Sequence, residues 1–206
     1  MSNNAGRVVG VGYTAAGTRA FLWTAGVMQD LGVLPGGGAD SYSYAGDIND
    51  VGQVVGAAGH GPAGPGSGPD HAFLWTAGAG MRDLGILPEG SELQYYAAGI
   101  NEHGYVVGSS RTPVLGGGNH AFLWTEAGGM QDLDTLIDPL DQLRTVTTLL
   151  GASDMNNAGQ IVSYGLINGK QHAYLLSPVP EPASGALTVI GLGLVGLMMW
   201  RPHRRH

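Results

Sequence analysis

Cysteine is absent from all 206 residues, which excludes disulfides, thiolate nucleophiles and cysteine-ligated zinc. Charged residues make up only 12% of the chain, and aromatic residues 7%. A chain with so few charges and this much apolar content is not a charged disordered tail. The start also lacks a basic segment followed by an apolar one, the pattern of an export signal. Since other features below indicate export, we expect the chain to be truncated at its N-terminus.

Positive charge is scarce outside the last few residues. All 16 acidic residues lie at or before Glu181, whereas three of the nine basic residues are Arg201, Arg204 and Arg205. The long stretch before residue 183 is therefore acidic. Because phosphate contacts dominate nucleic-acid affinity, a binder of DNA or RNA needs a basic face. We expect no nucleic-acid partner.

Glycine is abundant, with 37 residues, and two phrases alternate along the chain. The first reads "NNAGRVVG", "NDVGQVVG", "NEHGYVVG" and "NNAGQIVS", beginning at Asn3, Asn49, Asn101 and Asn156. The second is the "AFLW" phrase, whose alanines at positions 20, 72, 121 and 173 lie 52, 49 and 52 positions apart. A third phrase, of the type "MxDL", follows the first three copies. A period near 50 predicts a propeller or a solenoid.

Each phrase predicts a turn or a strand. Asn and Gly before a valine pair favour a turn, because Asn tolerates the left-handed region and Gly enters it freely. In "AFLWT", Phe73 and Trp75 point to one side while Ala72 and Leu74 point to the other. Both faces are apolar, so copies of the sheet must cover both.

Four strands per unit follow from "SYAGDIN", "QVVGAA", "HAFLWT" and "MRDLGIL". We therefore predict an all-β, propeller-like fold with about four blades of about 50 residues, the terminal blades incomplete. The aromatic residues of the repeated phrase are expected in the core rather than on a ligand-binding surface. They are Phe21, Trp23, Phe73, Trp75, Phe122 and Trp124.

Residues 183–200, "ASGALTVIGLGLVGLMMW", carry no charge. As a helix they would span about 27 Å, enough for the hydrocarbon core of a bilayer. Trp200 lies where an interfacial aromatic is expected, and the arginines of the tail, residues 201–206, would stay cytoplasmic. The pattern predicts a single transmembrane helix with the N-terminal body outside.

A short motif precedes this segment: Val179, Pro180, Glu181 and Pro182. Two prolines around a glutamate favour an extended, accessible peptide. This motif, the apolar segment and the arginine-rich tail together resemble the PEP-CTERM sorting signal of Gram-negative bacteria, over residues 179–206. The resemblance implies recognition by an exosortase, processing near the motif, and delivery from the inner membrane to the cell surface or extracellular matrix. In that role the motif is recognised and is not catalytic.

The repeats, residues 1–178, resemble the extracellular HAF-repeat family, through "HAF" at residues 71–73 and 120–122. The chain departs from that pattern at Arg19, Tyr174 and Ser163. The family implies no catalytic or binding residues that can be transferred to this chain.

Repeated histidines and aspartates are the candidate chemical groups: His71, His120 and His172, with Asp30, Asp83 and Asp132. Three histidines could converge on a metal, and paired carboxylates could form a glycosidase. Their repetition in register instead favours structural hydrogen bonding in each unit. The carboxylates Asp134, Asp138 and Asp141 of the following loop could join Asp132 around a cation, but their spacing fits no calcium loop, so a solvated loop is the simpler interpretation. We predict no catalytic, cofactor-binding or metal-binding residue.

The sequence thus predicts a non-enzymatic exported protein, sorted by an exosortase, with a β-repeat ectodomain in a structural or binding role. Exopolysaccharide is a candidate partner. The alternative is a polysaccharide hydrolase or lyase on a propeller scaffold, and a third possibility keeps the C-terminal helix as a permanent anchor.

Overall fold

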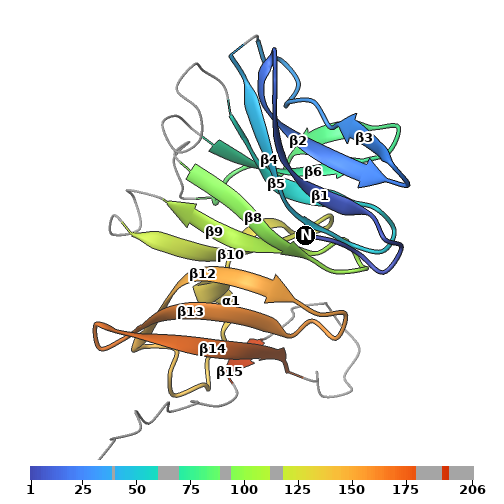
Figure 1. Cartoon of the computed structure of the whole chain (residues 1–206). Coiled ribbons are helices and arrows are strands. Elements are labelled where there is room, and N and C mark those ends of the chain that lie inside the picture. The colour runs from blue at the N-terminus through green and yellow to red at the C-terminus, as the bar shows by residue number, and fades with distance from the viewer. Residues whose placement is uncertain (39, 60–69, 89–93, 112–117, 180–191, 195–206) are drawn as a thin grey trace, which may run out of the picture.

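The computed structural model describes residues 1–38, 40–59, 70–88, 94–111, 118–179 and 192–194. These residues form strands almost throughout, with one short helix, so the all-β prediction is confirmed. The strands fall into four consecutive units (Figure 1). The first unit has β1 (Val8–Thr14), β2 (Gly17–Thr24) and β3 (Val27–Asp30). The second has β4 (Tyr42–Ile48), β5 (Val54–Gly59), β6 (Asp70–Thr76) and β7 (Gly80–Asp83).

The third and fourth units follow the same plan. The third has β8 (Gln94–Ile100), β9 (Val106–Arg111), β10 (Asn119–Thr125), β11 (Gly129–Asp132) and the helix α1 (Leu133–Leu136). The fourth has β12 (Thr147–Met155), β13 (Ile161–Ile167), β14 (Lys170–Pro178) and β15 (Leu192–Leu194). The four strands predicted for each complete repeat are therefore confirmed in the second and third units.

Strands within each unit pair antiparallel with their neighbours in chain order. One parallel pair, Asp70 with Gln94, joins β6 to β8 and links the second and third units into an eight-stranded sheet. The first strand of the second, third and fourth units carries a register shift near its end, as between Ala45 and Asp47. Such a bulge increases the local twist of the strand.

The units stack in an open row from the blue first unit to the orange fourth (Figure 1). In the part of the chain that the structure describes, no sheet closes on itself, so the predicted propeller ring is not observed. The physical reason lies in the cores. Each of the three apolar clusters is shared by two consecutive units, which satisfies the need for cover without a ring.

The repeated "AFLW" strand places its two faces in different clusters, as predicted. Phe73 and Trp75 of β6 pack towards the first unit, whereas Ala72 and Leu74 pack towards the third. Phe73 and Phe122 are fully buried, at 0% exposure, and burial of such a side chain contributes about 1.5–3 kcal/mol. The core prediction is confirmed for Phe73, Trp75, Phe122 and Trp124.

The same prediction is wrong for the first unit. Trp23 is 36% exposed and Phe21 is only half-buried, while Ala20 and Leu22 on the opposite face of β2 are buried. The aromatic face of each unit packs on the unit before it. Among the described residues, no sheet covers that face of the first unit.

An asparagine ladder joins the four units at their turns. The side-chain Nδ2 of Asn3 donates to the Asn49 carbonyl (2.9 Å), that of Asn49 to the Asn101 carbonyl (3.0 Å), and that of Asn101 to the Asn156 carbonyl (3.3 Å). The Oδ1 atom of each asparagine accepts from the backbone N–H four residues later. Each side chain thus closes its own turn, and those of the first three units also bind the next unit.

The ladder corrects the sequence-based explanation of these asparagines. Outside glycine, positive φ among the described residues occurs only at Ala25 and Asn168, so none of the four ladder asparagines is left-handed. The glycine three residues after each asparagine does take positive φ, as at Gly52 (91°). Asparagine is therefore needed for its amide, which donates and accepts at once.

The predicted helix over residues 183–200 falls outside the described residues except at 192–194, which form β15. In this structure these three residues pair with β14, at the edge where "MxDL" strands lie in earlier units. Within the described part of the chain, no helix has the length and apolarity to cross a membrane.

Candidate functional site

The repeated histidines and aspartates meet within the second and third units. In the second unit, His71 Nδ1 on β6 lies 2.8 Å from Asp83 Oδ2 on β7. In the third, His120 Nδ1 on β10 lies 3.0 Å from Asp132 Oδ2 at the end of β11. Antiparallel pairing of the third and fourth strands brings these side chains together. The histidines thus pair with their own aspartates and do not converge on one another.

The second oxygen of each aspartate closes the turn that follows. Asp30 Oδ1 accepts from the Gly32 N–H and Asp83 Oδ1 from the Gly85 N–H, both at 2.8 Å. Likewise, Asp132 Oδ1 accepts from the N–H of Asp134, two positions later. The predicted structural role of the "MxDL" aspartates is confirmed by these bonds.

The outer units lack the pair. Arg19 takes the place of histidine in the first unit, and its guanidinium donates to the Ser41 carbonyl, on the connection to the second unit. His172 in the fourth unit is half-buried, and no "MxDL" segment follows it. Among the described residues no carboxylate forms an ion pair with His172.

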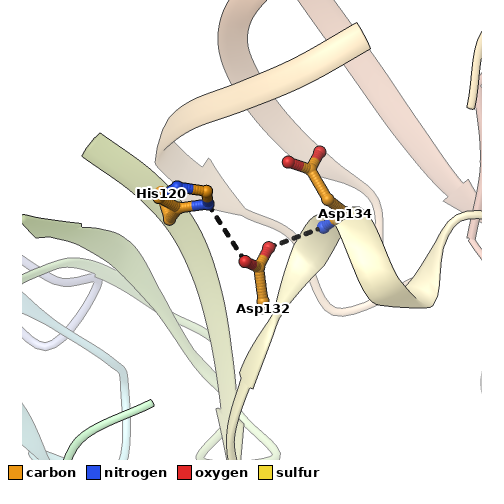
Figure 2. A group of neighbouring side chains, drawn as sticks. All are labelled: His120, Asp132 and Asp134. Atoms are coloured by element: carbon orange, nitrogen blue, oxygen red, sulfur yellow. Dashed lines mark hydrogen bonds and ion pairs between the residues drawn. The ribbon is translucent and has the colours of Figure 1, made fainter. Parts of the chain in front are cut away.

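The third unit adds a carboxylate to its pair (Figure 2). Asp134 stands where Gly32 and Gly85 stand in the other units, and α1 begins there, with Asp132 Oδ1 accepting from the Asp134 N–H at 2.9 Å. Possible ligand atoms of His120, Asp132 and Asp134 lie within 4.8 Å of one another. Of the described residues, only this group contains three metal-ligand side chains at such distances.

The contacts of this group connect three elements. Asp132 uses one oxygen for His120 and the other for the first turn of α1. Both oxygens of Asp134 accept from the Leu149 N–H on β12, at 3.0 and 3.3 Å. A cation would have to displace hydrogen bonds that hold the third unit to the fourth. The arrangement therefore fits a structural hydrogen-bond cluster.

Burial makes the charged form of the Asp134 carboxyl less favourable. Loss of solvent raises the pKa of its carboxyl to about 6, and the neighbouring Asp132 carboxylate raises it too, while the Leu149 N–H and His120 oppose the shift. The side-chain exposures of His120 and Asp132 are only 10% and 13%, so this cluster is shielded from solvent screening. Asp134 can therefore exchange a proton in the mildly acidic range.

The other loop carboxylates do not join the cluster. Asp138 Oδ1 accepts from the Leu140 N–H, and Asp141 Oδ1 from the Leu143 N–H, both at 2.8 Å. These are local turn bonds on the surface. The loop of four carboxylates is thus divided between a cluster and two separate turns.

The C-terminal motif lies almost wholly beyond the described residues. Val179 ends the described segment and is exposed. The other predicted residues, Pro180, Glu181, Pro182, Trp200, Arg201, Arg204 and Arg205, lie outside the described part of the chain.

Residues 178–205 match the PEP-CTERM protein-sorting motif. The predicted sorting signal is thereby confirmed. A comparison with curated proteins finds no match. The resemblance of the repeats to the HAF-repeat family, and the division of the chain at residue 178, remain predictions.

Proposed function

We propose that this chain is an exported protein that an exosortase processes at its C-terminal motif, and that its β-repeat body serves at the cell surface or in the extracellular matrix. The match of residues 178–205 to the PEP-CTERM motif is the observation that carries the proposal. The order of its parts, a Pro-Glu-Pro peptide, an uncharged segment and a cluster of arginines, is that of a substrate held at a membrane.

In the precursor, residues 183–200 cross the inner membrane with the repeats outside. The lack of charge in the segment and the arginines after it support this step. Leu192–Leu194 would then have to leave the edge of β14, where they form β15.

The body has a structural or binding role and no catalytic one in this proposal. The repeated histidines and aspartates support it, because they pair within the second and third units and the aspartates close local turns. A hydrolase would need a free acid and base at an open site.

The test is intact-mass spectrometry of the chain, exported in a bacterium that has an exosortase and in the same strain without it. We expect a mature form that has lost a C-terminal segment beginning within residues 178–205, and only in the first strain. Glu181→Ala should abolish the shortening. Glu126→Ala, an exposed glutamate on the third unit, is the matched control and should be processed normally.

An unshortened chain in the membranes of both strains would overturn the sorting proposal in favour of a permanent anchor. Turnover of matrix glycans by the purified chain would overturn the non-enzymatic role.

A further inference from the structure

A cavity of about 430 Å³ opens between the second and third units. Its walls come from β4, β5 and β6 on one side and from β8, β9 and β10 on the other, with one residue of β1 at the margin. The cavity lies at the end of the sheets where the parallel pair joins β6 to β8. None of the histidine–aspartate pairs lines it.

Two tyrosines at equivalent repeat positions form aromatic walls. Tyr44 and Tyr96 stand on the first strands of their units, opposite the small residues Ala57 and Ser109 in the register. Tyr96 is 44% exposed. It also lies over Gly46 of β4, where a Cβ would come within 3.0 Å of its hydroxyl. An exposed tyrosine of this kind offers a flat apolar face together with a polar tip.

Polar side chains form a row beside the tyrosines. The row crosses four adjacent strands, β6, β8, β9 and β10. In the register, Asp70 pairs with position 94, position 94 pairs with Arg111, and Arg111 pairs with Asn119. Strands lie about 4.8 Å apart, so Asp70 and Arg111 are separated by about 10 Å at the backbone. Asp70 accepts from the Tyr42 hydroxyl, which fixes its carboxylate in the wall. Arg111 is exposed and forms no ion pair with another described residue.

A hydroxyl of β9 completes the cavity. Ser109 is half-buried and lines the cavity opposite Tyr96 in the register. The next residue, Ser110, is only 1% exposed, because alternate residues of a strand point to opposite faces. The second unit carries alanine at the position of Ser109, Ala57.

One departure from the repeat falls on this wall. Where β5 reads "VVGAAG", β9 reads "VVGSSR", so three small residues become two hydroxyls and a guanidinium. The backbone pairing of the two strands is otherwise equivalent. These polar groups are not needed to build a unit, and Ser109 and Arg111, which share one face of β9, both line the cavity.

We propose that this cavity binds a saccharide. The apolar C–H faces of a sugar ring would pack on Tyr44 and Tyr96, as apolar surface packs on aromatic rings. Its hydroxyls would donate to the Asp70 carboxylate and accept from Arg111 and Asn119, while Ser109 can do either. A wholly apolar ligand would make no hydrogen bond with Arg111 or Asn119, and a phosphate would be repelled by the Asp70 carboxylate. The proposal goes beyond C-terminal sorting and does not depend on it.

Calorimetric titration and saturation-transfer NMR with the full chain test the proposal. The probes are cellotetraose, which is neutral, and trigalacturonate, which is acidic. We expect at least one probe to bind, and Ser109→Ala and Tyr96→Leu each to weaken binding about tenfold, the loss of roughly one hydrogen bond or one packed ring. Ser109→Ala copies Ala57 of the second unit and is expected to fold normally. Arg144→Gln, an exposed arginine outside the cavity, is the control and should leave binding unchanged.

Arg111→Gln separates the two kinds of sugar. A tenfold loss for trigalacturonate alone would assign an acidic sugar whose carboxylate meets Arg111, and equal small losses for both probes would assign a neutral one. No binding of either probe at 10 mM (a limit of about −2.7 kcal/mol), or binding that all three cavity variants leave unchanged, would overturn the proposal. Ser109→Ala should still be processed normally at its C-terminus, because saccharide binding and sorting involve different parts of the chain.

Discussion

Asp83 and Asp132 each use one carboxylate oxygen for a turn and the other for a histidine. Asparagine could supply only one acceptor oxygen, and glutamate would place its oxygens one bond further from the turn. The residue type is thus determined by two local partners, and catalysis is not needed to explain its repetition. In the third unit the same aspartate also begins a helix, because Asp134 replaces the glycine of the turn.

Asp134→Asn tests the buried carboxyl. Because the pKa of Asp134 is raised from 3.8 to about 6, the folded state holds this proton more tightly than the unfolded chain does. The associated stability is complete below about pH 4 and is lost as the pH rises through about 6. The asparagine does not titrate, and its amide oxygen can still accept from the Leu149 N–H.

We therefore expect the stability of Asp134→Asn, relative to the unchanged chain, to increase between pH 4 and pH 7. Urea unfolding followed by circular dichroism at each pH gives the two free energies of unfolding. A difference that stays constant over this range would show that the carboxyl keeps its ordinary pKa.

At the scale of elements, the sequence was sufficient to predict the strands but not what joins them. The valine pairs and the "AFLW" phrases predicted both their strands and the side to which each residue points, since period-two alternation is a local property. The asparagine ladder could not be predicted in the same way, because it depends on side chains from separate units lying one above the other. The recurrence of asparagine in all four units was the available signal.

Asn49→Ala should destabilise the protein by about 2–3 kcal/mol. It removes the bond to the Asn101 carbonyl, which lies in a buried region, together with the bonds to Gln53. Asn156→Ala is the matched control. It removes the same local turn bonds at the last unit, and Asn156 donates to no carbonyl of a later unit among the described residues.

Urea unfolding of the two variants isolates the contribution of the link between units. We expect Asn49→Ala to lose about 1 kcal/mol more than Asn156→Ala, the contribution of one hydrogen bond between units, since the Asn101 carbonyl keeps its bond from the Gly104 N–H. Equal losses would mean that the asparagines stabilise only their own turns.

At the scale of the whole molecule, a row of sheets satisfies the same packing requirement as a ring. The period of about 50 residues, the four strands and the two apolar faces are common to both arrangements, so the sequence could not distinguish them. What differs is the twist between units, which the bulges and the ladder set together. The cavity is a further consequence of that twist, and its polar wall could have been noticed only as a departure of "VVGSSR" from its repeat.

In an open row, a core substitution should destabilise mainly the two units that share its apolar cluster, because each cluster joins only two consecutive units. Trp124→Ala should cost about 3–5 kcal/mol, since Trp124 is buried in the cluster of the second and third units. Trp23→Ala, at the equivalent position of the first unit, should cost less than half as much, because Trp23 is partly exposed.

Hydrogen exchange should show lost amide protection in β4–β11 for Trp124→Ala, and unchanged protection in β12–β14 for Trp23→Ala. Protection lost evenly in all four units in both variants would contradict the nearest-neighbour arrangement and would favour a closed, fully cooperative ring.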